Sequence, residues 1–369
     1  MKMNKNIRIN YTQLILLIIG NQLGLIVYVL PSAITILAQG SSWLAIVLAG
    51  VGGSICASLM HMLHKQFSNQ MFFDYIHVLT GKPLGICIIL SYTLYFILLA
   101  TQFVVTFQYV INDWILLLTP KGVIIFLTLL PCYLLIKRSI NTIVRFCSIV
   151  ISTSLFIYII YFIFIFIYYT QYDFDLLRFI PIMQTNGKQL LLAVHQAFTY
   201  ISGFSILLFI LPFVTGESKR VWRYVLFGNG ITVIFCIILI ITINLFQSIQ
   251  ETMMIQYPWL YLLRGMSYTA LSGFDLLFIP FSLGSYIVSL TLTLYMASIG
   301  VKNLSNNISQ PKIAFLISCL VITLAMYPVN QYIFQRFSFY FSWITYLFVF
   351  IIPLLLLILA KIKKTFRGE

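Results

Sequence analysis

The sequence predicts an all-α polytopic membrane protein of about ten transmembrane helices, arranged as two inverted repeats of five helices. Hydrophobic residues make up 61% of the 369 residues and charged residues only 8%, as is typical of membrane proteins. The gaps between apolar runs are short, so we expect a single membrane domain, 1–369, without a soluble module. Two of the apolar runs, one in each half of the chain, are interrupted midway by small and polar residues.

Ten apolar segments are predicted to cross the membrane. In chain order they are 12–37, 41–63, 84–110, 121–136, 143–169, 189–214, 222–247, 272–299, 312–333 and 339–360. The first five form a repeat at about 12–169, and the second five form a repeat at about 189–360. Because five is odd, the second repeat enters the membrane from the opposite side, so the first and sixth spans correspond.

The first and sixth spans are the two interrupted runs. The first is broken at 20–24 by Gly-Asn-Gln-Leu-Gly, and the sixth around 199–203 by Thr-Tyr-Ile-Ser-Gly. Lipid cannot pair with non-helical backbone, so a break persists only where protein, water or a ligand supplies hydrogen bonds. Paired broken helices are the best sequence pointer to a substrate site in transporter-like folds. We therefore expect a small polar molecule to bind at mid-membrane.

The distribution of positive charge predicts the orientation. Of the 22 Lys and Arg residues, 17 fall on the side of the amino terminus, and only five fall on the other side: Lys121, Arg178, Lys188, Arg264 and Arg336. This bias predicts that both termini are cytoplasmic. The net charge of +14 then belongs to the cytoplasmic face, where it attracts anionic lipid; no role in nucleic-acid binding is expected.

Two outer loops are longer than tight turns. Segments 170–188 and 248–271 mix apolar and charged residues at near-helical spacing, which favours a short helix on the outer surface. Such a helix either covers the span ends as a lid or binds a partner.

The chain offers no pattern for metal binding or catalysis. Its six cysteines lie within or at the edge of spans without Cys-x-x-Cys spacing, so neither a metal site nor a disulfide framework is predicted. Paired carboxylates, a nucleophile with its base and a phosphate-binding loop are absent from the sequence. We therefore expect neither a cofactor nor enzyme activity.

The first break supplies candidate ligand-binding residues. Gly20 and Gly24 permit unusual backbone conformations, and Asn21 and Gln22 bring amides to the same depth. A helix that restarts near Leu25 would direct free N–H groups and a positive dipole toward a carboxylate. The alternative is that the two glycines form a small-xxx-small pair for helix packing.

The second break contributes Thr199, Ser202, Gly203 and Phe204. Small and hydroxylated residues at this depth are expected to contact the ligand, although such hydroxyls often bond only to their own helix. One turn outward, His195 either senses protons or orients a ligand, or it is a hydrogen-bonded interior histidine.

Spans three and eight complete the candidate site. Tyr95 and Leu99 share one face of span three, where an aromatic stripe more often belongs to the core. Ser285 and Ser289, with Ser282, form a hydroxyl face on span eight that must point at protein or a water-filled cavity.

Ionisable groups inside the membrane are scarce. Asp275, at the outer start of span eight, is the one acid in the sequence that falls near membrane depth. Proton-driven carriers usually use such a group as a relay, so proton coupling is disfavoured. Sodium coupling stays open, because carbonyls and hydroxyls suffice as sodium ligands.

The chain resembles the spore germination permeases, the B-type subunits of germinant receptors, along essentially its whole length. The motifs are Gly20-Asn-Gln-Leu-Gly24 leading to Leu30-Pro31, then Trp43, Gly50, Thr80-Gly81-Lys82, Thr119-Pro120, Ile140-Asn-Thr-Ile-Val-Arg145 and Leu211-Pro212-Phe213. The family often shows Glu-Arg-x-Asp before span eight and a Trp within it. Here only Asp275 of that motif is kept, and the Trp is absent.

The resemblance implies a LeuT/APC-type fold of the amino acid–polyamine–organocation superfamily, located in the spore inner membrane. It also implies that the chain binds a germinant, commonly an amino acid, beside A-type and C-type receptor subunits. Carried over by motif, the ligand would contact both breaks, Tyr95, Leu99 and the hydroxyl face of span eight. The favoured function is thus a ligand-sensing receptor subunit. A secondary amino-acid transporter of the same superfamily is the first alternative, and a scaffold without ligand binding is the second.

Overall fold

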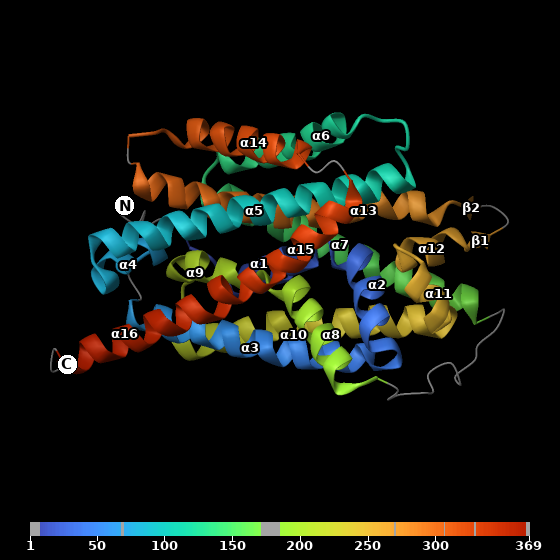
Figure 1. The fold of residues 1–369 in the computed structure, drawn as a ribbon, viewed down its shortest axis with the longest axis horizontal. Coiled ribbons are helices and arrows are strands. Elements are labelled where there is room, and N and C mark those ends of the chain that lie inside the picture. The colour runs from blue at the N-terminus through green and yellow to red at the C-terminus, as the bar shows by residue number, and fades with distance from the viewer. Residues whose placement is uncertain are drawn as a thin grey trace.

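The computed structural model describes residues 8–67, 70–170, 185–268, 271–305, 307–327 and 330–366, and these are almost entirely helical (Figure 1). The α-helices are α1 (Tyr11–Leu23), α2 (Ile26–Ala38), α3 (Ser42–Gln66), α4 (Phe72–Thr80), α5 (Lys82–Trp114), α6 (Lys121–Ile136), α7 (Ile140–Tyr169), α8 (Gly187–Ile201), α9 (Leu207–Ile210), α10 (Ser218–Phe246), α11 (Ile249–Met254), α12 (Pro258–Arg264), α13 (Phe274–Leu304), α14 (Gln310–Met326), α15 (Gln331–Tyr346) and α16 (Ile352–Phe366). Short 3₁₀ turns, a π-helical turn at Leu347–Ile351 and a hairpin of β1 (Ser267–Tyr268) and β2 (Leu271–Ser272) complete the described elements.

The predicted ten-span fold is confirmed. Seven helical segments in the described part of the chain are long and apolar enough to cross a membrane alone, and one of them, Ile26–Gln66, contains both α2 and α3. Shorter apolar helices, α1, α6 and α14, supply the rest. Span one therefore consists of α1 and α2, span six of α8 and the short turns after it, and span ten of α15 and α16 joined by the π-helical turn.

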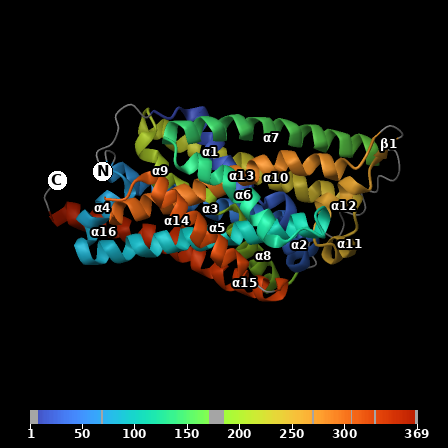
Figure 2. The same cartoon turned by 90° about the horizontal axis from the view of Figure 1, so that it is seen from above.

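The two broken spans lie at the centre of the bundle. α1 packs against α7, α10 and α13, and α2 packs against α8. α6 and α14 lie side by side at the periphery (Figure 1). The end of α16 lies with α4 at one end of the molecule, and α11 and α12 lie at the other (Figures 1 and 2).

Both breaks begin near the carboxyl-terminal end of the segments in which they are predicted, 20–24 and 199–203. In span one, residues 20–23 stay helical within α1, and only Gly24 and Leu25 separate α1 from α2. In span six, α8 continues to Ile201, and the interruption consists of Ser202 followed by a 3₁₀ turn at Gly203–Ile206. The prediction that the first helix restarts near Leu25 is confirmed.

The loop at 248–271, which is predicted to be outside, contains the expected short helices. α11 begins with a capping box in which Ser248 Oγ accepts from the Glu251 N–H and the Glu251 carboxylate accepts from the Ser248 N–H. α12 buries Trp259, Leu260 and Leu263 as it packs against α2 and α13. This burial fits the lid interpretation. In the other loop predicted to be outside, residues 171–184 are not among the described residues.

Candidate functional site

The two breaks contact each other directly. Asn21 Nδ2 donates a hydrogen bond of 2.7 Å to the Gly203 carbonyl, and Gln22 Nε2 donates one of 2.9 Å to the Ile201 carbonyl. A Cβ at Gly203 would lie 2.9 Å from the carbonyl carbon and oxygen of Asn21. Because real Cβ atoms do not approach backbone so closely, only glycine fits there. The side chains of one broken helix thus satisfy carbonyls released by the other.

The hydrogen bonds that Asn21 and Gln22 donate to span six are here called the amide clamp. The clamp extends to neighbouring helices through Asn229 of α10. Gln22 Nε2 also donates to Asn229 Oδ1 at 3.0 Å. Asn229 Nδ2 in turn donates to the Gly50 carbonyl at 3.1 Å and to Ser54 Oγ at 3.0 Å on α3. This network fixes the orientation of the Gln22 amide, because both hydrogen-bond partners of its Nε2 atom are acceptors.

Two acceptor oxygens of the clamp have no partner. Asn21 and Gln22 are 6% and 2% exposed, and their Oδ1 and Oε1 atoms form no hydrogen bond with any described residue. An unpaired buried acceptor costs about 1–3 kcal/mol. Such groups in native proteins need an explanation, and a bound ligand is one.

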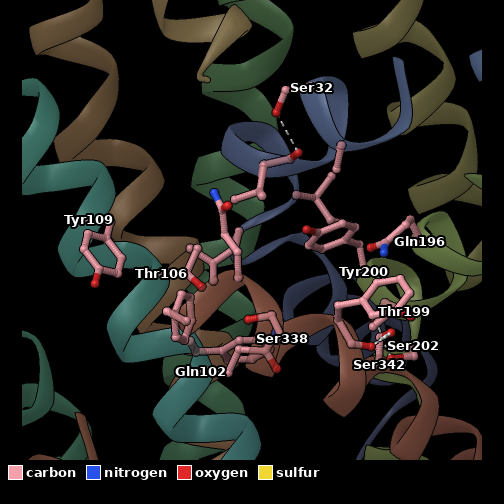
Figure 3. A pocket seen from close by; sticks show the side chains of 18 of the residues that line it. Ser32, Gln102, Thr106, Tyr109, Gln196, Thr199, Tyr200, Ser202, Ser338 and Ser342 are labelled. Atoms are coloured by element: carbon pink, nitrogen blue, oxygen red, sulfur yellow. Dashed lines mark hydrogen bonds between the residues drawn. The ribbon is translucent and has the colours of Figure 1, made fainter. Parts of the chain in front are cut away.

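A cavity of about 680 Å³ extends from the breaks toward α11 (Figure 3). Its walls come from α2, α5, α8, α11 and α15, and its polar lining residues are Asn21, Gln22, Ser32, Gln102, Thr106, Tyr109, Gln196, Thr199, Tyr200, Ser202, Ser205, Gln256, Tyr257, Thr293, Gln331, Gln335, Ser338 and Ser342. No Asp, Glu, Lys, Arg or His is among the described residues that line it. The lining combines polar and apolar side chains and carries no formal charge.

The start of α2 reaches the cavity wall through Leu25, Ile26 and Val29. No side chain caps this helix start. The first N–H groups of a helix have no partner within the helix, and they carry the positive end of its dipole. The start of α2 therefore brings potential donors to the cavity wall, whereas the two unpaired clamp oxygens are buried beside it.

Six of the twelve predicted site residues line this cavity: Asn21, Gln22, Leu99, Thr199, Ser202 and Gly203. Two of the hydroxyls bond back to their own helix, since Thr199 Oγ1 donates to the His195 carbonyl at 2.9 Å and Ser202 Oγ donates to the Thr199 carbonyl at 2.7 Å. Their oxygens keep lone pairs for a ligand donor.

Four predicted residues, Gly20, Gly24, Ser285 and Ser289, lie where α1, α7 and α13 meet, outside the cavity lining. A Cβ at Gly20 would lie 2.7 Å from the Ile151 side chain, and one at Gly24 would lie 2.4 Å from Ser289 Oγ. Ser289 Oγ donates to the Gly20 carbonyl at 2.6 Å, and Ser285 Oγ accepts from Tyr158 at 3.2 Å. The geometry therefore supports the alternative in which Gly20 and Gly24 serve close helix packing.

The remaining two predicted residues, Tyr95 and Phe204, are buried in aromatic packing and do not line the cavity. The Tyr95 ring stacks on Phe348, with centroids 4.5 Å apart. Phe204 lies against α3, where a Cβ at Gly53 would lie 2.5 Å from its ring. Both side chains shape the bundle around the breaks.

The structure adds a wall that the sequence interpretation missed. Gln331, Gln335, Ser338 and Ser342 of α15 line the cavity at spacings of four, three and four residues. Polar residues at this helical spacing are a periodic signal. Gln102 and Thr106 likewise continue the Leu99 face of α5.

His195 lies behind this wall. Its Nε2 is 2.7 Å from Ser342 Oγ, and its ring stacks on Trp343 with centroids 4.0 Å apart. His195 does not line the cavity. These contacts match the interior-histidine alternative.

The cavity ends at α11 beside two acidic residues. Tyr257, which lines the cavity, donates to Asp113 Oδ2 at 3.1 Å. Burial and the nearby Asp113 raise the pKa of Tyr257, so its phenol keeps its proton at neutral pH. Asp275 accepts from Trp114 Nε1 at 2.8 Å and does not line the cavity.

At the opposite end, the segment before α1 joins the end of span six. Ile9 pairs with Val214 in a parallel bridge: its N–H donates to the Phe213 carbonyl at 2.9 Å, and its carbonyl accepts from Thr215 at 3.2 Å. Tyr11 stacks on Tyr224 with ring centroids 4.5 Å apart. The two broken spans are therefore joined beyond the breaks, on the side away from α11.

Ten spans with two broken helices that meet at a polar cavity define a membrane protein with a transporter-type fold. Comparison with solved structures agrees: Mhp1, a nucleobase-cation-symport-1 family transporter in a closed conformation with bromovinylhydantoin bound, superposes with a TM-score of 0.68. The match covers 94% of this chain and 79% of Mhp1 at 9% sequence identity. At that identity the likeness concerns the fold.

The sequence comparisons then give the family. A family model described as spore germination protein, the spore permeases, matches residues 8–333, and the chain belongs to this family. The chain is 23% identical over 374 residues to spore germination protein YndE of Bacillus subtilis (strain 168), with 98% of each protein covered. It is 21% identical over 259 residues to spore germination protein B2 of the same organism, covering 70% of this chain and 69% of that protein.

Proposed function

We propose that this chain is the membrane subunit of a spore germinant receptor, and that it binds a small zwitterionic amino acid between the two broken helices. The observation that supports this most is the uncharged polar cavity beside two unpaired amide oxygens. A scaffold subunit would have no use for two polar helix breaks that meet at such a cavity.

The proposed binding mode uses the complementary ends of a zwitterion. The ligand's carboxylate meets the free N–H groups at the start of α2, as anions do at helix N-termini. Its ammonium meets Asn21 Oδ1 and Gln22 Oε1, whose amide nitrogens are already held by span six. The side chain faces Leu25 and Leu99, which line the cavity.

The absence of formal charge around the cavity sets the proposed selectivity. A zwitterion brings two charges that compensate each other, whereas lysine or glutamate brings a third. An uncompensated charge at membrane depth is costly. We therefore expect small or apolar zwitterionic amino acids to bind in preference to cationic or anionic ones.

The proposed setting is the spore inner membrane, with A-type and C-type receptor subunits as partners. Membership of the spore germination family supports this setting. The charge bias of 17 against five supports the proposal that both termini are cytoplasmic.

Orientation is testable by labelling Asn186→Cys in a variant whose six native cysteines are replaced. Asn186 is exposed at the start of α8, so an impermeant thiol reagent should label it from outside the cell. A Cys in the Glu217–Arg223 segment should be labelled only from the cytoplasmic side. Labelling of position 186 exclusively from the cytoplasm would invert the proposed topology.

A secondary amino-acid transporter is the second candidate, because the fold is shared with a transporter. The uncharged lining argues against proton coupling, since no described titratable Asp, Glu, Lys or His lines the cavity. Uptake of radiolabelled alanine into proteoliposomes, measured beside alanine binding to the same preparation, separates the functions. We expect saturable binding without concentrative uptake. Uptake against a gradient would establish the transporter, and absence of binding to the assembled receptor would leave a scaffold.

A further inference from the structure

A second concave site lies on the outer surface of the bundle, between α3 and α10. This groove, here called the α3–α10 groove, has a volume of about 640 Å³. It is lined by Val47, Gly50, Val51, Ser54, Ile55, Ser58, Leu59, Met62, Leu226, Asn229, Gly230, Val233 and Ile234. The lining is apolar except for two serines and one asparagine.

Small residues create the groove. Gly50 lets α10 approach closely, because a Cβ there would lie 2.4 Å from the Val233 side chain. Across the groove, a Cβ at Gly230 would have no atom within 4 Å. Small residues at this contact thus bring the helices together and leave open space on their outward side.

The polar groups of the groove are already paired. Ser54 Oγ donates to the Gly50 carbonyl and accepts from Asn229, and Ser58 Oγ donates to the Ser54 carbonyl and accepts from the Trp222 indole. The walls are exposed: Val51 is 56%, Ile55 53% and Ile234 59% accessible. A surface of this kind offers dispersion contacts and no unmet hydrogen bond, which suits a hydrocarbon chain.

The length of the groove matches a lipid chain. From Val47 to Met62 the α3 wall is about 22 Å long at 1.5 Å per residue. Half of a bilayer's hydrocarbon core is roughly 15 Å thick, so a chain that starts at one interface is covered throughout its leaflet.

Positive charge marks one end of the groove. On α3, Lys65 lies about one turn beyond Met62 on the groove side of the helix. On α10, Trp222 and Lys219 lie about one and two turns before Leu226 on the groove side. Both lysines are exposed, and neither forms an ion pair with a described residue. Glu217, the acid nearest in sequence, pairs with Arg220 at 3.3 Å. Trp is enriched at membrane interfaces, so this end belongs at headgroup depth.

We propose that the α3–α10 groove binds one acyl chain of an anionic phospholipid, whose phosphate lies at the end carrying Lys65 and Lys219. Charge complementarity favours a lipid over a partner's transmembrane helix, because such a helix gains nothing from two unpaired lysines. The site also adjoins the clamp: Asn229 lines the groove and accepts the hydrogen bond from Gln22.

The test is native mass spectrometry of the full chain, released from nanodiscs that contain equal amounts of phosphatidylglycerol and phosphatidylcholine. We expect one retained phosphatidylglycerol per chain. The double variant Lys65→Gln/Lys219→Gln should retain roughly 30-fold less, since each lysine near the surface contributes about fivefold. Gly230→Phe should lose retention by filling the open space, since a Cβ at this position meets no atom within 4 Å.

Two matched variants control for charge and bulk. Lys82→Gln removes an exposed lysine at the start of α5, and Leu127→Phe enlarges a residue that is 57% exposed on α6; neither should change retention. Equal retention in all variants, or equal retention of both lipids, would refute the site. So would disulfide or photochemical crosslinking of Ile55→Cys to a transmembrane helix of another receptor subunit, because that helix would then occupy the groove.

Discussion

Gly203→Val is expected to abolish the response to germinant and to lower the amount of folded protein. The new Cβ would lie 2.9 Å from the backbone carbonyl of Asn21, and backbone at a helix end cannot turn aside as a side chain can. Overpacking of this kind costs about 1–3 kcal/mol. The hydrogen bond from Asn21 to the Gly203 carbonyl would break as the two spans separate.

Gly187→Val is the matched control, because Gly187 begins the same span and a Cβ there meets nothing within 4 Å. Thermal unfolding of the purified protein and ligand binding should both be unchanged in the control. In Gly203→Val, the unfolding temperature and the ligand affinity should both decrease. A Gly203→Val protein with normal stability and normal binding would show that the breaks do not need their close contact.

Gln22→Leu is expected to lose ligand binding and to destabilise the bundle. Its amide donates to the Ile201 carbonyl and to Asn229 Oδ1, so leucine leaves two buried acceptors without these donors. Each such group costs about 1–3 kcal/mol. The variant also removes one of the two unpaired oxygens proposed for the ligand's ammonium.

Gln196→Leu provides the comparison for stability. Gln196 lines the cavity but donates none of the clamp hydrogen bonds, so its loss should leave the unfolding temperature within a degree or two of the wild type. If Gln22→Leu unfolds at the same temperature as Gln196→Leu, the clamp does not stabilise the breaks.

The location of the breaks was predictable, and their extent was not. Glycine and amide residues within otherwise apolar runs indicate that the helix is interrupted. Residues 20–23 nevertheless stay helical, because Gly20 and Gly24 are used to bring α1 against α13. Glycine permits both a break and a close helix contact, and local sequence does not distinguish the two.

The hydroxyl face of α13 shows the same limit. Its sequence requires polar surroundings, but the partners come from distant elements: Tyr28 on α2 for Ser282, Tyr158 on α7 for Ser285, and the Gly20 carbonyl for Ser289. Tertiary packing decided that this face contacts protein rather than the cavity. The α15 stripe, by contrast, follows helical periodicity and was open to prediction.

Competition binding decides whether the two broken helices form a zwitterion site, with labelled alanine on the assembled receptor and valine, lysine, glutamate and inosine as competitors. The uncharged cavity predicts that valine competes, whereas lysine and glutamate bind about 100-fold more weakly, because a third charge at this depth costs roughly 3 kcal/mol. Tight binding of lysine or glutamate, or displacement by inosine alone, would contradict a zwitterion site formed by the two broken helices.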